Sequence, residues 1–363
     1  MRRQHFDAFA PICPLCLHNG QGEYPLNLVT ILRESTESIE EGILHCSNLQ
    51  CQREYPIIDG IPILLCDVSE LTTHQSLGLL MRADLSVTMS GLLNDSMGAN
   101  SEYDLIRQQL SCYAFDHYED LSPESDSESG SIARVMNLMF EHVAESNFPC
   151  ALDIGCSVGR GSFQLAERTR ELVLGVDKNI AMLRMAQHVL HQQQVNYDLR
   201  RVGIVYERRE FPVSFPNKEN VDFWCCDATA LPFRNNMMDF VVSLNVLDCL
   251  SGPILGLREM ARLVRPKGTM LLTTPFDWSS GATAMEAWIG GHSQRGPNQG
   301  RSEQILRALL TPGAHPQSLT GVRIRKEWND LSWQVRLHER SRMMYRLFGL
   351  FVDVLEAENN PEK

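Results

Sequence analysis

The segment LDIGCSVGRG at residues 152–161 combines residue types that bind ligands in α/β proteins. An apolar run ends at the acidic Asp153, and three glycines follow, Gly155, Gly159 and Gly161. A strand–loop–helix turn of this kind can hold a dinucleotide pyrophosphate, a triphosphate or a ligand without phosphate. The spacing and the charge of the loop decide among these three ligand classes.

The loop departs from both phosphate-binding patterns. The dinucleotide pattern G-x-G-x-x-G requires a glycine where Ser157 stands, and the loop lacks the G-K-S/T ending of a triphosphate-binding loop. The carboxylate of Asp153 also repels an anion and attracts a cation. The sequence therefore predicts a positively charged ligand without phosphate. S-adenosylmethionine, which carries an ammonium and a sulfonium, has both properties.

The elements that would position this loop alternate between strand and helix over residues 132–357. Buried apolar runs predict strands at 150–155, 171–177, 221–228, 238–247 and 269–276. Helical periodicity predicts helices at 162–169, 179–193 and 254–268. Apolar strands separated by helices indicate a Rossmann-like α/β fold, with a doubly wound, mostly parallel sheet covered on both faces.

Polar residues stand at the ends of the predicted strands, where open α/β sheets bind ligands. The predicted cofactor-binding residues are Asp153, Gly155, Gly159, Asp177, Asp227, Ala228 and Asn245. Asp153 can meet the ammonium directly or through water, and the helix after Gly159 offers free N–H groups to the carboxylate. Asp177 can accept hydrogen bonds from both ribose hydroxyls, and Asp227 can accept one from the adenine amino group. Asn245 lies at the same crevice.

This ordered set of stretches resembles the class I S-adenosylmethionine-dependent methyltransferases. The matching stretches are LDIGCSVGRG, LGVDKN, CCDATALPF, MDFVVSLNVL and ARLVRPKGTMLLTTPF, spread over residues 152–276. Two features depart from the family, Ser157 where most members have glycine and a long insertion between residues 194 and 220. A weaker similarity, in DIGCSVGR, PFDW and WIGG, is to the methyltransferase domain of ovothiol-synthesis enzymes, which methylates a mercaptohistidine imidazole.

Four cysteines near the N-terminus form two close pairs. They are Cys13, Cys16, Cys46 and Cys51. Two thiolate pairs, each at the tip of a hairpin, match a tetrahedral zinc ion, with His18 and His45 as nearby substitutes. Four unrelated cysteines are the other interpretation. The pairs and YPIIDGIPILL (55–65), with its turn at Asp59 and Gly60, resemble the small zinc-ribbon activator protein of tRNA and protein methyltransferases, which implies a structural zinc.

Composition divides the chain into three predicted domains. Residues 1–66 form a zinc-ribbon-like domain, 67–131 a helical lid with an acidic linker, and 132–363 the methyltransferase domain. Apolar residues at helical spacing predict a helix over 102–118, and the acidic stretch 122–131 has no apolar residue to bury. A helix on such a tether could cover the ligand. A plain packing helix is the alternative interpretation.

Methyl transfer to a neutral amine, an imidazole or a thiolate mainly requires that the nucleophile be positioned, so the sequence needs no base motif. His117 and His338 are nevertheless candidate general bases, and Trp288 and Trp333 are candidate walls of the substrate pocket. For each of the four, ordinary packing is the alternative interpretation.

The net charge of −12 disfavours a nucleic-acid substrate, so we predict a small-molecule acceptor. The alternative is an RNA or protein methyltransferase whose zinc ribbon docks the macromolecule. No apolar run reaches the roughly 20 residues of a membrane helix, so no membrane partner is expected. Several of the 11 cysteines sit in apolar runs, as reduced thiols do, which predicts a cytoplasmic protein.

Overall fold

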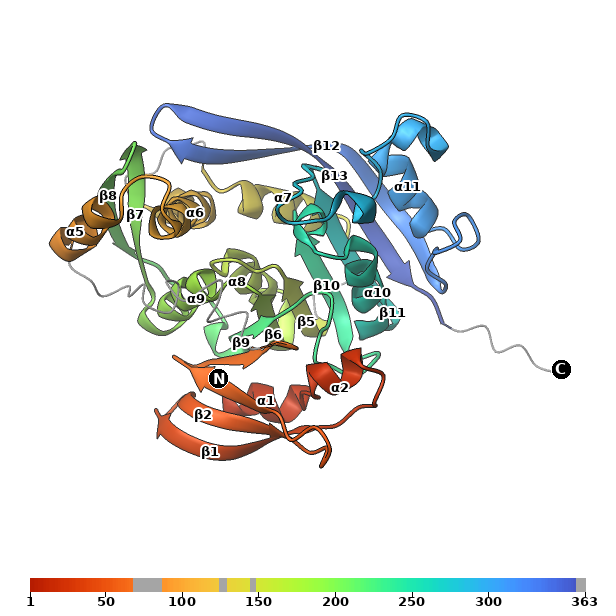
Figure 1. Ribbon diagram of the computed structural model, residues 1–363, viewed down its shortest axis with the longest axis horizontal. Helices are drawn as coiled ribbons and strands as arrows, with labels where there is room; N and C mark the ends of the chain where they lie inside the picture. Colours follow the sequence, from red (N-terminus) through yellow and green to blue (C-terminus); the bar gives the residue numbers. More distant parts are fainter. Residues whose placement is uncertain (68–86, 124–128, 144–147, 357–363) are drawn as a thin grey trace.

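The computed structural model describes residues 1–67, 87–123, 129–143 and 148–356, and a large mixed sheet dominates it (Figure 1). The strands of this sheet are β1 (Leu26–Glu34), β2 (Ile39–Cys46), β3 (Glu54–Ile58), β4 (Ile61–Leu64), β5 (Phe148–Ile154), β6 (Thr169–Asp177), β9 (Val221–Cys226), β10 (Met238–Leu244), β11 (Val264–Thr274), β12 (Val322–His338) and β13 (Ser341–Val354). Their spatial order is β1-β2-β3-β4-β9-β6-β5-β10-β11-β13-β12.

The centre of the sheet is parallel, from β4 through β9, β6, β5 and β10 to β11. Antiparallel strands extend it at both edges, β3-β2-β1 on one side and β13-β12 on the other. The predicted α/β fold is therefore confirmed, and the sheet as a whole is mixed around a parallel core.

Helices cover both faces of the sheet. They are α1 (Arg3–Phe9), α2 (Pro14–His18), α5 (Val87–Met97), α6 (Glu102–Tyr118), α7 (Ser131–Phe140), α8 (Arg160–Ala166), α9 (Ile180–Gln192), α10 (Pro253–Leu263) and α11 (Ser302–Leu309). Side chains along the central strands alternate between two apolar cores. On β10, Phe240 and Val242 face the core that includes α6 to α9, whereas Val241 faces the core that includes α10 and α11.

The helix predicted at 254–268 ends earlier, because α10 stops at Leu263 and β11 begins at Val264. Pro266 explains the difference, since proline in a helix interior loses a hydrogen bond and the residue before it disfavours helical geometry. The predicted insertion is a separate hairpin of β7 (Gln194–Val202) and β8 (Val205–Pro212). Helix α6 packs beside this hairpin, where Arg107 forms a buried ion pair with Asp198 at 2.8 Å.

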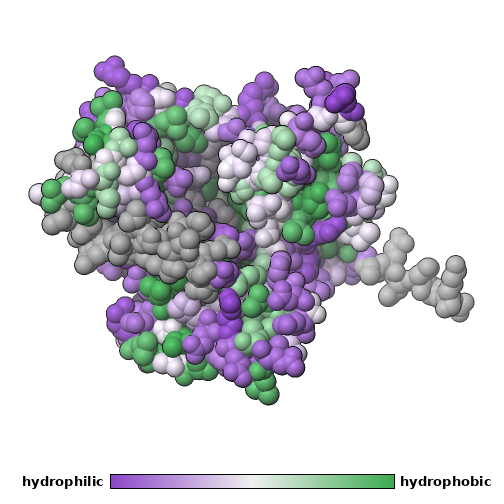
Figure 2. Space-filling model, viewed as in Figure 1, coloured by the Kyte–Doolittle hydropathy of each residue, from purple (hydrophilic) through white to green (hydrophobic). Residues whose placement is uncertain are grey.

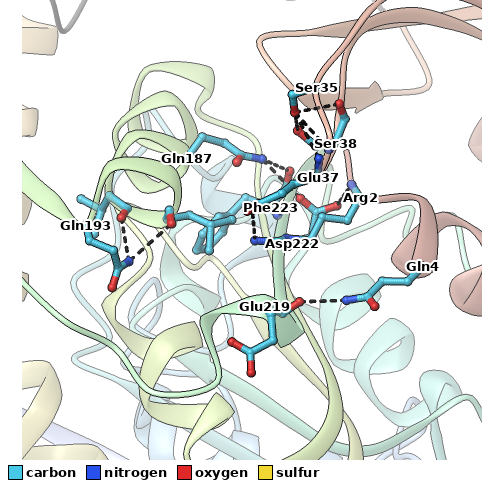
Figure 3. A network of polar contacts seen from close by, with 12 residues as sticks. Arg2, Gln4, Ser35, Glu37, Ser38, Gln187, Gln193, Glu219, Asp222 and Phe223 are labelled. Carbon is cyan, nitrogen blue, oxygen red and sulfur yellow. Dashed lines mark hydrogen bonds and ion pairs between the residues drawn. The ribbon is translucent and has the colours of Figure 1, made fainter.

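The N-terminal segment is joined to the central sheet through β4, which pairs with β9 in parallel at Ile63–Cys225 and Leu64–Cys226. A polar network supports this junction (Figure 3). The buried carboxylate of Asp222 in β9 accepts hydrogen bonds at 2.9 Å from the Arg2 amide and from Trp224 Nε1. The four-cysteine region and the parallel core thus share one hydrogen-bonded sheet.

The predicted boundaries at residues 66 and 131 stay a prediction. The helix predicted over 102–118 is α6, while 68–86 and the acidic stretch at 124–128 lie outside the described residues. Among the described residues, no helix is long and apolar enough to span a membrane. Hydrophilic and hydrophobic residues are interspersed over the face in Figure 2.

Candidate active site and metal centre

The glycine loop connects β5 to α8 in a conformation that side chains would obstruct. Gly155 and Gly159 have φ values of 73° and 96°, a region that favours glycine. A Cβ atom on Gly155 would lie 2.2 Å from Cγ2 of Val246, and one on Gly159 would lie 2.7 Å from Cζ of Phe223. The two glycines therefore let the loop lie close against the end of β10 and against β9.

Asp153 lies under this loop, on β5. Its carboxylate is buried and accepts a hydrogen bond from Ser162 Oγ at 2.8 Å. Burial raises the pKa of Asp153 to about 7, although the Ser162 bond works in the other direction. A nearby cation would stabilise the ionised form of this carboxyl group and lower its pKa, because opposite charges attract.

Asp177 is the last residue of β6. One carboxylate oxygen accepts from the backbone N–H of Ser157 at 2.9 Å, and the other accepts from that of Asn179 at 2.8 Å. Burial raises the pKa of Asp177 despite these bonds. Each oxygen keeps one lone pair, so the carboxylate is oriented and can still accept two hydroxyl groups.

Asp227 follows β9 directly and is already engaged on both oxygens. One accepts from the backbone N–H and the hydroxyl of Thr229, and the other lies 3.1 Å from Lys178 Nζ. Burial alone would raise the pKa of Asp227, but the bonds from Thr229 and Lys178 outweigh it and lower the pKa. Any further donor at this position, such as the predicted adenine amino group, would share the carboxylate with Lys178. Ala228 is half-buried against the neighbouring apolar core.

Asn245 follows β10 with a φ of 57°. Its backbone N–H donates to Thr273 O at 2.9 Å, and its side-chain oxygen accepts from Thr273 Oγ1 at 2.9 Å. Because β9, β6, β5 and β10 are neighbours in the sheet, the polar residues at their carboxyl ends meet at one edge. The sequence had predicted this arrangement from the separate strand ends.

Helix α6 contacts the glycine loop through its last turn. Tyr118 donates its hydroxyl hydrogen to Val158 O, and the ring nitrogen Nδ1 of His117 accepts from Arg160 N at 3.4 Å. The guanidinium of Arg160 also lies 3.1 Å from a carboxylate oxygen of Asp120. The sequence predicted that the free N–H groups of α8 bind a ligand carboxylate. One of them, that of Arg160, instead donates to His117.

The two candidate bases lie in different surroundings. His117 is buried, and burial, followed by the charge of Arg160, lowers its pKa to about 3. The ring is thus neutral at physiological pH. His338 ends β12 and accepts from Arg340 N at 3.2 Å, in a turn whose Glu339 N–H donates to Arg201 O of the β7–β8 hairpin. Whether either histidine acts as a base stays a prediction.

The two candidate tryptophans also differ. Trp333 is 6% exposed and packs in the apolar core, on β12 opposite Tyr345 of β13. Trp288 stacks on Trp278 with ring centroids 6.1 Å apart, and its Nε1 donates to Thr283 O at 2.8 Å. The hydroxyl of Thr283 in turn donates to Asp248 O. Trp288 is therefore linked to the loop after β10, whereas Trp333 contributes to the core.

A second group of polar residues gathers beyond the ends of β10 and β11. Asp248 accepts from Thr274 Oγ1 at 3.1 Å and from the Asp277 amide at 2.9 Å. Tyr345 donates its hydroxyl hydrogen to Asp277 at 2.9 Å. Sequence reasoning singled out none of Asp248, Asp277 and Tyr345, although Asp277 follows the fifth predicted strand as the other acids follow theirs. Tyr345 comes from an antiparallel strand far along the chain and had no local signal.

Tyr113 of α6 faces this second group. Its hydroxyl lies within electrostatic range of Asp177, Cys249 and Tyr345. Tyr113 is 45% exposed, yet burial raises its pKa, so protein surrounds the ring on most sides while solvent still reaches it. Burial likewise raises the pKa of the exposed Cys249 to about 11, with the negative charges of Asp248 and Asp277 adding to the effect. Tyr113 and Cys249 thus lie near Asp177, at the carboxyl ends of the parallel strands.

The four predicted cysteine ligands converge. Cys13 immediately precedes α2, which holds Cys16. Cys46 is the last residue of β2, and Cys51 lies in the turn before β3. The four Sγ atoms lie within 4.8 Å of one another, with Cys13–Cys51 at 3.9 Å and Cys16–Cys46 at 3.8 Å. Neither His18 nor His45 belongs to this group in the described part of the chain.

The geometry of this cluster fits a tetrahedral ion. Zinc with Zn–S bonds of about 2.3 Å separates its sulfur ligands by about 3.8 Å, whereas a disulfide requires about 2.05 Å. Groups around the sulfurs can donate to thiolates. The backbone N–H of Asn48 points to Cys46 Sγ and its amide to Cys16 Sγ, both at 3.4 Å, while the Tyr55 hydroxyl lies 3.1 Å from Cys13 Sγ.

A glycine loop with polar groups at the carboxyl ends of adjacent parallel strands is the arrangement at which open α/β sheets bind ligands. Residues 152–272 match the family described as "Methyltransferase domain". The chain therefore contains an S-adenosylmethionine-dependent methyltransferase domain, as the sequence predicted. No curated protein matches the chain.

Solved structures give partial likenesses. One is phosphoethanolamine N-methyltransferase 2 of Haemonchus contortus, with 21% identity and a TM-score of 0.31 over 39% of this chain and 28% of that chain. A methyltransferase of Methanosarcina mazei has 18% identity and a TM-score of 0.38, over 60% of this chain and 97% of that chain. A methyltransferase of Aquifex aeolicus has 14% identity and a TM-score of 0.34, over 61% of this chain and 89% of that chain. This chain thus spans less than a third of the nematode enzyme.

Proposed function

We propose that this protein transfers a methyl group from S-adenosylmethionine to a nitrogen nucleophile of a small, positively charged molecule. The observation that carries the proposal is the row of polar groups at the carboxyl ends of β9, β6, β5 and β10, beside the second group around Asp277. S-adenosylmethionine supplies an electrophilic methyl group, and transfer of this group converts the sulfonium into a neutral thioether. The protein's own residues bind and orient the two reactants.

In this proposal the first row holds the cofactor. Asp153 attracts the ammonium, Asp177 accepts from the ribose, and Asp227 shares its carboxylate between Lys178 and the adenine amino group. Asn245 is fixed by Thr273 at the same edge. Replacing Asp177 by Ala should weaken cofactor binding by about 1.5–3 kcal/mol, the scale of hydrogen bonds to a charged group. Calorimetry should detect this loss, and thermal unfolding of the ligand-free variant controls for damage to the loop.

The acceptor would lie beside the cofactor, between α6 and the loops after β10 and β11. Asp277, whose carboxylate accepts a hydrogen bond from Tyr345, supplies a negative charge there, which suits an amine or imidazole with a second cationic group. The neighbouring Cys249 keeps its proton at neutral pH, since its pKa is about 11, and so does not compete as a nucleophile. Tyr345 holds Asp277 by a hydrogen bond and so orients its carboxylate toward one position.

The test is methyl transfer from radiolabelled S-adenosylmethionine to cell extract that is divided into RNA, protein and small molecules. The small molecules are divided again by ion exchange. After unreacted S-adenosylmethionine, itself a cation, has been separated, we expect label in a product retained by a cation exchanger, and loss of that label with Asp277→Asn while cofactor affinity stays unchanged. Label in RNA or protein would instead favour the alternative, in which the four-cysteine region docks a macromolecule. Label in an anionic small molecule would contradict the proposed acceptor.

We also propose that the four-cysteine cluster binds one structural zinc ion, because its sulfur spacing and its N–H donors suit thiolate ligands. The similarity of this region to the methyltransferase activator protein, and of the catalytic domain to ovothiol-synthesis enzymes, stays a prediction. Metal analysis of purified protein should give about one zinc per chain. A metal-free protein with a fully stable N-terminal region would contradict the proposed ion.

A further inference from the structure

Ser157 stands at the centre of the glycine loop in a backbone conformation that costs free energy. The backbone N–H of Gly159 donates to Cys156 O, so residues 156–159 form a tight turn with Ser157 at its second position. Ser157 has a φ of 52°, in the left-handed region. Glycine, asparagine and aspartate are the residues that such a turn position favours. A glycine here would avoid the cost.

The side chain of Ser157 adds a second cost. The residue is 8% exposed, and its hydroxyl oxygen is buried without a hydrogen-bond partner among the described residues. An unpaired buried hydroxyl destabilises a protein by about 1–3 kcal/mol. Neither cost is offset by a contact of the hydroxyl within the folded chain that the structure describes. The serine therefore suits an interaction with something outside that part of the chain.

The position of Ser157 indicates what that partner is. Its backbone N–H holds the carboxylate of Asp177 at 2.9 Å, and its neighbour Val158 accepts from Tyr118 of α6. Ser157 thus lies between the residue proposed to bind ribose and the helix that covers the loop. Rotation about the Cα–Cβ bond moves the hydroxyl among three staggered positions, which lets it turn from the buried side of the loop toward the ligand.

We propose that the hydroxyl of Ser157 donates a hydrogen bond to an oxygen of S-adenosylmethionine and makes Ser157 an affinity-determining residue of the loop. This inference rests on the proposed cofactor site. The oxygen belongs either to a ribose hydroxyl or to the carboxylate of the methionine portion, since both are acceptors. Methylthioadenosine, which keeps the ribose and lacks the amino-acid portion, separates the two.

The test compares Ser157→Gly and Ser157→Ala with the unmodified protein. Ser157→Gly relieves the backbone cost, so the ligand-free variant should unfold at the same or higher denaturant concentration. Its affinity for S-adenosylmethionine should nevertheless fall about tenfold, which corresponds to about 1.4 kcal/mol. Ser157→Ala, which keeps Cβ, should lose the same affinity. Asn236→Gly, an exposed residue with a φ of 58°, is the control for relief of left-handed geometry elsewhere.

Each outcome has one meaning. Loss of affinity for both S-adenosylmethionine and methylthioadenosine assigns the bond to the ribose, and loss for S-adenosylmethionine alone assigns it to the carboxylate. If Ser157→Gly binds both ligands as tightly as the unmodified protein, the inference is overturned. The hydroxyl then only destabilises the fold and contributes nothing to binding. Failure of the unmodified protein to bind either ligand would instead overturn the proposed function.

Discussion

Asp153 provides a sharp test of the proposed cofactor site, because its protonation and cofactor binding must be linked. In the ligand-free protein its pKa is about 7. A cofactor ammonium within ion-pair distance lowers a carboxyl pKa by roughly 1–3 units. With a shift of about two units, the complex titrates near pH 5. Binding then releases the proton that part of the free protein carries.

The magnitude follows from these two pKa values. At pH 6.5 about three quarters of the free protein carries the proton on Asp153 and almost none of the complex does, so binding releases about 0.7 proton. Because the pKa is lower in the complex, affinity is greatest above pH 7 and falls about fivefold from pH 7 to pH 6. Near pH 8 the α-amino group of the cofactor begins to lose its own proton, so affinity declines again.

The assay is isothermal titration calorimetry at pH 6.5 in buffers with different ionisation enthalpies, since the slope of observed against ionisation enthalpy counts the protons. Asp153→Asn keeps an acceptor for Ser162 and cannot titrate. Its affinity should be lower and nearly constant between pH 6 and pH 7. A buffer-independent enthalpy for the unmodified protein, or an unchanged pH slope in the variant, would refute a direct role of Asp153.

Three further changes test other parts of the molecule. Gly159→Ala should lower stability by about 1–3 kcal/mol in denaturant unfolding, because its φ is 96° and a Cβ would press on a buried phenylalanine ring; equal stability would contradict this packing. Cys16→Ser should abolish bound zinc in metal analysis, and unchanged metal content would exclude this ligand. Tyr118→Phe leaves the buried Val158 carbonyl without its donor and should cost about 1–3 kcal/mol of stability. Hydrogen exchange over 102–118 should slow when cofactor binds the unmodified protein, and equal rates would reduce α6 to ordinary packing.

The strand ends could be predicted from the sequence because the signal there is local. An apolar run stops where the chain leaves the core, and a polar residue such as Asp177 or Asn245 follows at once. The two cysteine pairs also carry their own spacing. These features need no knowledge of distant residues, and the structure brings both sets together.

Other features depend on partners far apart in the sequence. The contacts of Tyr118 with Val158 and of Tyr345 with Asp277 span 40 and 68 residues, and no local pattern announces them. Helix α7 carries no glycine or acidic motif and was not predicted. The pairing of β4 with β9 was also missed, because a strand of four apolar residues is equally consistent with a hairpin alone.

That pairing has a consequence for the edge of the parallel sheet. Every residue of β9 is buried, from Val221 to Cys226, and β4 covers the side of β9 that would otherwise be an open edge. An uncovered apolar edge strand is a template for aggregation. The four-cysteine region therefore protects the catalytic sheet as a cap. Partial detachment of that region would expose the apolar edge of β9 before the parallel core itself unfolds.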